Sequence, residues 1–218
     1  LEYDDVPDNS EEYIENSRNL TERIAANSVD AAISQLERFL DKPDIPFFQW
    51  LHLFDPHAQY TPPSPFKEKF ANNLYDGEIA YTDHCLGKFF EFLRKQKIID
   101  NTILVIMADH GEGLGEHGEA SHGYFLYNST LHIPLIIRDL ALSNSKGIKI
   151  SRQIRSIDVM PTVLSLMEIK DHGKSEGVDF SKFLNSSANM EEWPEVVSYA
   201  ETFFPYFAFG WKPLQSLS

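Results

Sequence analysis

The segment from Asp109 to His122 holds the densest group of side chains that could do chemistry. It contains four glycines, three histidines and several carboxylates within fourteen residues. Asp109 and His110 stand side by side directly after an apolar run, and carboxylate oxygen and imidazole nitrogen are both ordinary ligands of divalent cations. The chain must turn here, and Gly111 and Gly113 make such a turn sterically permissible. Asp109 and His110 are therefore candidate metal ligands.

A second segment, Phe54-Asp55-Pro56-His57, also joins a carboxylate to an imidazole after an apolar run. Four prolines between residues 55 and 65 predict an irregular but stiff loop, because proline fixes φ and removes a backbone donor. In open α/β sheets, ligands bind outside the carboxyl ends of the strands. The two loops could therefore meet at one site.

Each of these residues also has an ordinary structural interpretation. Asp109 could bond its own backbone in a polar turn, and His57 could be a surface residue packed on Tyr60. A two-residue pattern does not decide between these alternatives without its structural context. His117 and His122 could be solvated loop residues. Asp55 and Glu112 could be carboxylates that anchor a loop or orient a histidine.

The elements that must position these loops follow from the apolar pattern. Apolar residues at spacings of three and four predict helices from about Ile24 to Leu40 and from beyond Tyr75 to near Lys97. Apolar runs of strand length predict buried strands. Helices and strands alternate, which predicts an α/β fold with a mostly parallel or mixed sheet flanked by helices. The expected strands are 47–54, 102–108, 133–137 and a late edge strand at 196–199, and a helix through residues 161–167 is expected to be capped by Asp158.

Composition excludes some classes of function. The chain has 218 residues, 42% of them hydrophobic, and a formal net charge of -14, so nucleic acid is not an expected partner. No run reaches the roughly 20 apolar residues that span a bilayer, so we expect no membrane segment in this chain. The single cysteine, Cys85, cannot form an internal disulfide.

Seven ordered segments between Pro46 and about Ile169 carry a family resemblance. They are Pro46–Phe48, His52–His57, Tyr75–Asp83, Asp109–Glu112 with Leu114–Gly118, Ser121–Gly123, His132–Ile137 and Ser156–Thr162. Together they resemble the sulfatase family, a branch of the alkaline phosphatase-like superfamily. The resemblance implies an alkaline phosphatase-like fold and an enzyme that hydrolyses sulfate esters.

The resemblance also implies roles for individual residues. Asp109 and His110 match the pair that coordinates a divalent cation, usually calcium in this family. His57 matches the histidine that hydrogen-bonds the sulfate and helps to protonate the leaving oxygen. His122 lies near the position of a lysine that grips the sulfate in many relatives, so it is expected to contact an oxyanion. Asp83 and Asp158 match positions that look structural.

The sequence departs from the family pattern in what it lacks. No Cys/Ser-x-Pro-x-Arg motif, whose Cys or Ser becomes a formylglycine nucleophile, occurs in it, and the first acidic metal-binding pair is also absent. Cys85 is expected to be a small buried helix residue instead. We therefore expect residues 1–218 to be the C-terminal portion of one sulfatase-type domain, with a core at about 46–170 and an edge strand and aromatic tail at 171–218.

That expectation has consequences for partners and activity. The missing N-terminal half of the domain would be a partner, the substrate would be a sulfate-ester small molecule or a glycan, and the chain alone would be inactive. Two ligands would hold calcium weakly or not at all. The family suggests an extracytoplasmic or membrane-anchored parent protein, but the sequence itself leaves the location open.

Two other functions remain open. The first is a related phosphodiester or phosphonate hydrolase, or a phosphoethanolamine or phosphoglycerol transferase, for which zinc or manganese is the expected metal. The second is a non-catalytic interaction module, which the aromatic tail Phe203–Trp211 would suit because an exposed aromatic patch favours a partner.

Overall fold

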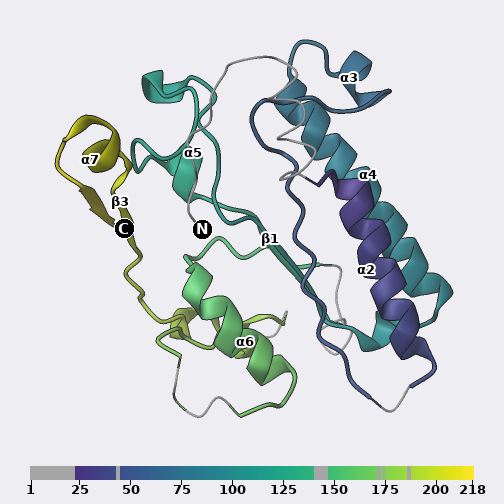
Figure 1. Ribbon diagram of the computed structural model, residues 1–218. Helices are drawn as coiled ribbons and strands as arrows, with labels where there is room; N and C mark the ends of the chain where they lie inside the picture. Colours follow the sequence, from purple (N-terminus) through teal and green to yellow (C-terminus); the bar gives the residue numbers. More distant parts are fainter. Residues whose placement is uncertain (1–22, 43–44, 140–146, 171–172, 174, 186–187) are drawn as a thin grey trace. The chain divides into compact units, whose positions relative to one another are not determined.

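The computed structural model, whose helices and strands Figure 1 labels, divides into two compact units, residues 1–99 and 100–218. Each unit has its own buried residues, which lie mainly on two helices in the first unit and include Phe180 and Phe183 in the second. The residues that the structure describes are 23–42, 45–139, 147–170, 173, 175–185 and 188–218.

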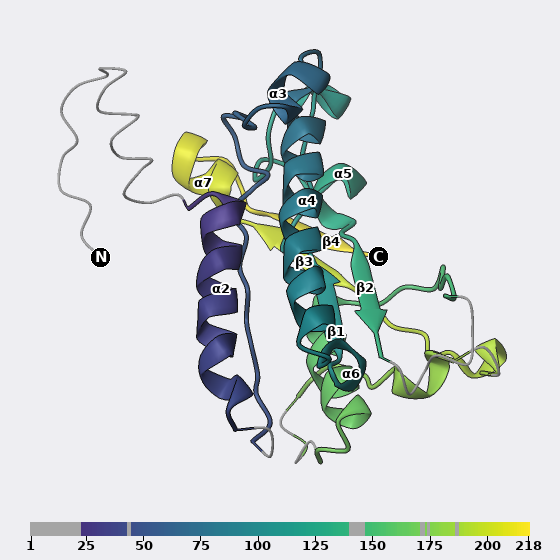
Figure 2. The same ribbon diagram turned by 90° about the vertical axis from the view of Figure 1, so that its right-hand side faces the viewer.

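In the first unit, α2 (Ala25–Leu40) packs along α4 (Leu74–Lys95), as Figures 1 and 2 show. Buried residues recur every three or four positions on both helices, so each helix has one apolar face. The predicted first helix is confirmed, and the second begins earlier than predicted, after Asn73, whose side chain accepts a hydrogen bond from the N–H of Asp76. The buried residues are Ala25, Val29, Ala32 and Leu36 on α2, and Gly77, Glu78, Tyr81, Cys85, Phe89 and Leu93 on α4.

The predicted central strand at 47–54 is wrong for this structure. These residues belong to no strand, and the side chains of Phe48 and Trp50 are 81% and 77% exposed. An apolar run becomes a strand only when a neighbouring backbone pairs with it, and none of the described residues does so here. The short helix α3 (Phe66–Lys69) follows the proline-rich loop.

The strands that the structure describes in the second unit form two separate antiparallel pairs. β1 (Leu104–Met107) pairs with β2 (Leu135–Arg138), with Leu104 opposite Arg138 and Met107 opposite Leu135. β3 (Tyr199–Thr202) pairs with β4 (Leu214–Leu217). The strands predicted at 102–108 and 133–137 are confirmed with small shifts, whereas the late strand begins at Tyr199 and not at residue 196.

The predicted parallel or mixed sheet is therefore not formed by the described residues, whose sheets are antiparallel and two-stranded. The apolar pattern identifies strands but carries no information about which strand pairs with which. The remaining short elements are η1 (Ile99–Asn101), η2 (Glu116–Gly118), α5 (Asn128–Leu131), η4 (Ser156–Asp158), α6 (Val159–Leu166), η5 (Ser181–Phe183), η6 (Met190–Glu192) and α7 (Phe204–Phe209).

Asp158 is the buried polar centre of the second unit. It is fully buried, and its carboxylate accepts hydrogen bonds from the backbone N–H groups of Arg155 and Val178 and from the Arg155 guanidinium. The expected cap on the helix at 161–167 is wrong in detail, because no such side-chain bond to α6 is formed. Asp158 instead closes the preceding turn and ties it to Val178.

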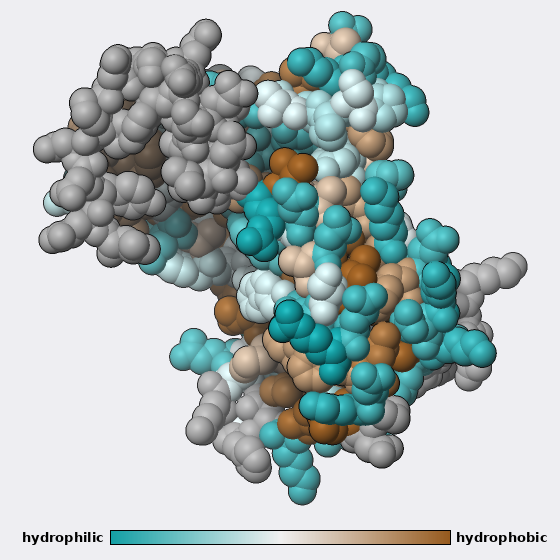
Figure 3. Space-filling model, turned by 45° about the vertical axis from the view of Figure 1, so that its right-hand side comes forward, coloured by the Kyte–Doolittle hydropathy of each residue, from teal (hydrophilic) through white to brown (hydrophobic). Residues whose placement is uncertain are grey.

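Polar side chains predominate on the face of the molecule drawn in Figure 3, with smaller hydrophobic areas between them. This distribution agrees with the net charge of -14. Among the helices of the described residues, none combines the length and the apolar character that crossing a membrane requires.

We expect Arg155→Gln to destabilise the protein by about 3–5 kcal/mol, because it leaves the buried Asp158 carboxylate without its counter-charge. The side chains of Glu192 and its partner Lys182 are 63% and 64% exposed, so Glu192→Gln should cost at most about 1 kcal/mol. Chemical denaturation of the intact protein would measure both changes. Equal losses in the two variants would contradict the assigned role of Asp158.

The stabilisation from Asp158 should also depend on pH. Burial alone would raise the pKa of Asp158, but the hydrogen bonds from Arg155 and Val178 outweigh it and hold the pKa below its ordinary value of 3.8. The contribution is therefore complete above that ordinary value and is lost as the pH falls through the lower pKa of the folded state. The stability difference between wild type and Asp158→Asn should shrink below about pH 4. A difference that stays constant on acidification would contradict this.

Candidate functional site

The loop that carries Asp109 and His110 follows β1 and packs closely on the chain around Ser129 and Thr130. The N–H of Gly111 donates to the carbonyl oxygen of Thr130 at 2.8 Å. A Cβ on Gly111 would collide with the carbonyl oxygen of Ser129, and one on Gly113 would lie 2.6 Å from that of Ser121. The two glycines are thus needed for close backbone approach and not, as expected, for the turn.

Asp109 and His110 bring a carboxylate oxygen and an imidazole nitrogen close to each other. His110 Nδ1 lies 2.7 Å from the carbonyl oxygen of Gly111, which only accepts, so Nδ1 carries the hydrogen and Nε2 is left for a ligand. That Nε2 atom is 3.8 Å from Asp109 Oδ2, and the side chains are 43% and 81% exposed. Two ligands of one cation lie about 3–4 Å apart at ordinary bond lengths. The pair therefore fits two positions of a cation site.

The donor set within the described residues stops at that pair. No group of three or more His, Cys, Asp or Glu residues among them is arranged to hold a metal ion. Calcium takes about six to eight ligands, so Asp109 and His110 fit part of such a site.

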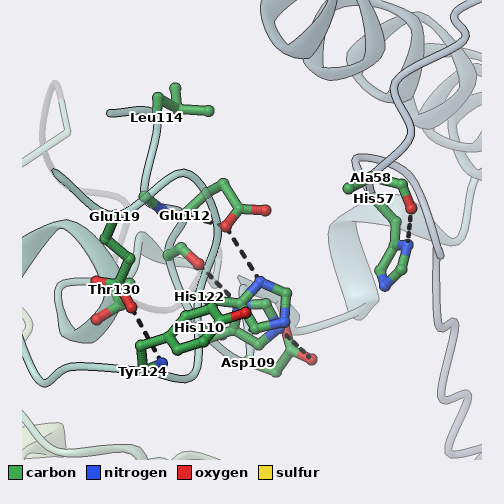
Figure 4. Close-up of polar contacts among 12 residues, drawn as sticks. His57, Ala58, Asp109, His110, Glu112, Leu114, Glu119, His122, Tyr124 and Thr130 are labelled. Atoms are coloured by element: carbon green, nitrogen blue, oxygen red, sulfur yellow. Dashed lines mark hydrogen bonds and ion pairs between the residues drawn. The ribbon is translucent and has the colours of Figure 1, made fainter. Parts of the chain in front are cut away.

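His122 lies against His110, with the ring centroids 4.0 Å apart (Figure 4). Its Nδ1 atom is 3.1 Å from Oε1 of Glu112, whose side chain is only 7% exposed. Because a carboxylate accepts, Nδ1 of His122 also carries the hydrogen. The structure thus brings Asp109, His110 and His122 together with Glu112.

The backbone around His122 is fixed from two sides. Oε1 of the buried Glu119 accepts a hydrogen bond from the N–H of Tyr124 at 3.0 Å (Figure 4). The same oxygen accepts from the N–H of Phe125, also at 3.0 Å. Thr202 Oγ1 donates to the carbonyl oxygen of Gly123 at 2.6 Å, and α7 packs against Tyr124 through Phe204, with ring centroids 4.8 Å apart. The sequence around Glu119 does not indicate this role, because it does not reveal burial.

His117 is set apart from the other histidines of this loop. Its φ of 59° is left-handed, and its ring stacks on Tyr127 at 4.0 Å. Its interpretation as an ordinary loop residue is therefore favoured, with an aromatic neighbour that the sequence did not indicate.

His57 belongs to the first unit, where it lies in the proline-rich loop. Its Nδ1 is 2.7 Å from the carbonyl oxygen of Ala58, so Nδ1 carries the hydrogen, and its ring lies 4.3 Å from that of Phe54. The loop is anchored at Asp55, whose Oδ2 accepts from the N–H of Ala25 at the start of α2 at 2.6 Å. Asp55 is thus a loop anchor.

Glu78 on α4 holds the same loop, a role that its sequence position does not predict. Its carboxylate accepts from the N–H of His57 at 3.0 Å and from that of Thr61 at 2.6 Å. Burial raises the pKa of Glu78 above its ordinary value, against the effect of these two donors. Neighbouring Gly77 packs on Pro62, to which an added Cβ would come within 2.8 Å. The sequence signal is the segment Tyr75–Asp83, which carries the family resemblance and contains Glu78.

Comparison with known sequences gives relatives of two kinds. The chain is 31% identical over 134 residues to the multifunctional alkaline phosphatase superfamily protein PehA of Trinickia caryophylli, covering 61% of the chain and 26% of PehA. It is 29% identical over 118 residues to an arylsulfatase of Clostridium perfringens, covering 53% of the chain and 24% of that enzyme. The chain thus spans about a quarter of the length of these relatives.

Solved structures share the fold. A Bacteroides fragilis protein assigned to the sulfatases as yidJ matches 81% of the chain and 43% of its own, with a TM-score of 0.69 at 23% identity. The match to the phosphonate monoester hydrolase SpPMH of Silicibacter pomeroyi covers 89% of this chain and 51% of that one, with a TM-score of 0.70 at 19% identity. The match to Ps i-CgsB in complex with k-i-k-neocarrahexaose covers 82% of this chain and 41% of that one, with a TM-score of 0.65 at 21% identity. The chain therefore has part of an alkaline phosphatase-like fold.

The sequence model of the sulfatases matches residues 1–169, which is well over half of the 218 residues. The matched range includes both histidine-bearing loops, at His57 and at Asp109 to His122. The chain belongs to the sulfatase family.

Proposed function

We propose that the intact protein hydrolyses sulfate esters with the help of a divalent cation. Asp109 and His110 would hold the cation, and His57 and His122 would contact the substrate. The observation that carries the proposal is the second-unit cluster, in which Asp109 Oδ2 and His110 Nε2 lie 3.8 Å apart and the His122 ring lies 4.0 Å from that of His110. A cation ligand pair beside an imidazole suits an anionic substrate.

The bound cation, His122 and His57 would have different roles in the reaction. A bound divalent cation would neutralise charge on the sulfate oxygens. His122 would present Nε2 to the sulfate, because its Nδ1 is held by Glu112. Any proton that His57 gives to the leaving oxygen would come from Nε2, since Nδ1 donates to Ala58.

The nucleophile is assigned to another part of the protein, as a formylglycine made from Cys or Ser. These 218 residues contain no Cys/Ser-x-Pro-x-Arg motif. Cys85 does not suit the role, because it is fully buried on α4 and burial raises the pKa of its thiol. By itself, the chain would then bind cation weakly and not turn over.

The substrate would be a sulfated small molecule or a sulfated glycan. The family assignment and the arylsulfatase relative support the sulfate ester. The complex of Ps i-CgsB with k-i-k-neocarrahexaose supports a carbohydrate as the organic part. Calcium is the first candidate for the cation, in line with the family resemblance.

A second candidate is hydrolysis of phosphonate monoesters or phosphodiesters. Two observations favour it. The first is the fold similarity to SpPMH. The second is the nitrogen ligand at His110, because an imidazole nitrogen is a better ligand for zinc than for calcium. Zinc or manganese would then replace calcium.

We expect Asp109→Ala and His110→Ala each to lower the metal content of the intact protein and to reduce kcat/KM by about 10²-fold or more, because charge stabilisation in the transition state is lost. Elemental analysis and steady-state kinetics would measure the two effects. His117→Ala is the matched control from the same loop, and it should behave like wild type because the His117 ring packs on Tyr127. Unchanged metal content and activity in Asp109→Ala would overturn the assignment.

Substrate class is tested on the intact protein with one leaving group on two kinds of ester. We expect kcat/KM to be higher for 4-nitrophenyl sulfate than for bis(4-nitrophenyl) phosphate or a 4-nitrophenyl phosphonate. After chelation, calcium should restore more activity than zinc or manganese. The opposite order of substrates, with restoration by zinc or manganese, would support the second candidate instead.

A further inference from the structure

Glu112 joins the two chemical parts of the loop. It follows the cation pair by two residues in sequence, yet its Oε1 atom is 3.1 Å from Nδ1 of His122, ten residues further on. The same oxygen accepts from the N–H of Gly113 at 3.1 Å. The side chain of Glu112 is only 7% exposed, so little water can compete for these hydrogen bonds. One buried carboxylate thus holds the imidazole of the proposed sulfate contact.

We propose that Glu112 is a positioning residue, which fixes the tautomer and ring orientation of His122 so that Nε2 faces the sulfate group. This inference rests on the proposed function for the identity of the ligand. An imidazole offers only one nitrogen along one in-plane direction once the other is bonded, so its usefulness depends on how the ring is turned. A carboxylate on Nδ1 decides both the rotation of the ring and the nitrogen that carries the hydrogen.

Both ends of this contact stand on fixed backbone. Gly113, next to Glu112, packs against the carbonyl oxygens of Ser121 and Glu119 without room for a Cβ. On the other side, Glu119 holds the N–H groups that follow His122 by two and three residues. The Glu112 to His122 bond therefore forms between two parts whose backbone is already held in place, which makes it an orienting contact.

His110 makes the test more demanding, because its ring lies 4.0 Å from that of His122. Loss of Glu112 could disturb the cation pair as well as the sulfate contact. The bond from His110 Nδ1 to the Gly111 carbonyl holds the His110 ring independently of Glu112. We therefore expect Glu112 to act through His122 and not through the cation.

The experiment is a double-mutant cycle on the intact protein with 4-nitrophenyl sulfate. Glu112→Ala should lower kcat/KM by about 10–100-fold without changing the metal content, the range typical of residues that orient a ligand. Glu112→Gln should lose less, because its amide oxygen still accepts from Nδ1–H. In a His122→Ala background, Glu112→Ala should cost nothing further. An equal loss in both backgrounds, or loss of metal in Glu112→Ala, would overturn the proposal.

A readout without turnover separates this inference from the proposed function. In protein labelled with ¹⁵N-histidine, the His122 signals should show hydrogen on Nδ1 in wild type and in Glu112→Gln, and a changed tautomer in Glu112→Ala. Identical His122 signals in all three proteins would refute the positioning role. Absence of any sulfate or phosphate ester hydrolysis would refute the proposed function and leave the tautomer comparison to decide the role of Glu112.

Discussion

Hydrogen bonds from backbone N–H groups to buried carboxylates are the interaction on which the histidine-bearing loops of this protein depend. Glu78 holds the loop of His57, Glu119 holds the chain after His122, and Asp158 closes the turn before α6. Irregular loops leave backbone donors that would be costly to bury unpaired, and an ionised carboxylate can accept several of them at once. The histidines are therefore displayed on chain that is held by charge-assisted hydrogen bonds.

The histidines themselves follow one rule. In His57, His110 and His122 the Nδ1 atom lies beside an acceptor, which is a carbonyl oxygen in the first two and the Glu112 carboxylate in the third. The hydrogen of each ring is thus fixed on Nδ1 by its acceptor. The consequence is a set of imidazoles with defined tautomers before any ligand arrives, which lowers the cost of orienting them in the reaction.

Local pattern predicted the elements better than their partners. The helix at Ala25–Leu40 and the strands near Leu104 and Leu135 were confirmed because spacing and run length are local properties. The strand at 47–54 and the parallel sheet were wrong, since pairing depends on backbone far away in sequence. The match covers only 43% and 51% of the length of two of the solved structures, so about half of each of those folds lies outside the matched part.

The sequence by itself determined the family and the candidate residues, because the order of the motif segments and the types of the side chains are written in it. The tertiary structure decided which candidates come together. In the fold, His122 lies beside His110, whereas the His117 ring stacks on Tyr127. Glu78 and Glu119 are the carboxylates that hold the loops. Burial and contacts between segments arise only when the chain folds, and they make one glutamate a solvated charge and another a fixed acceptor.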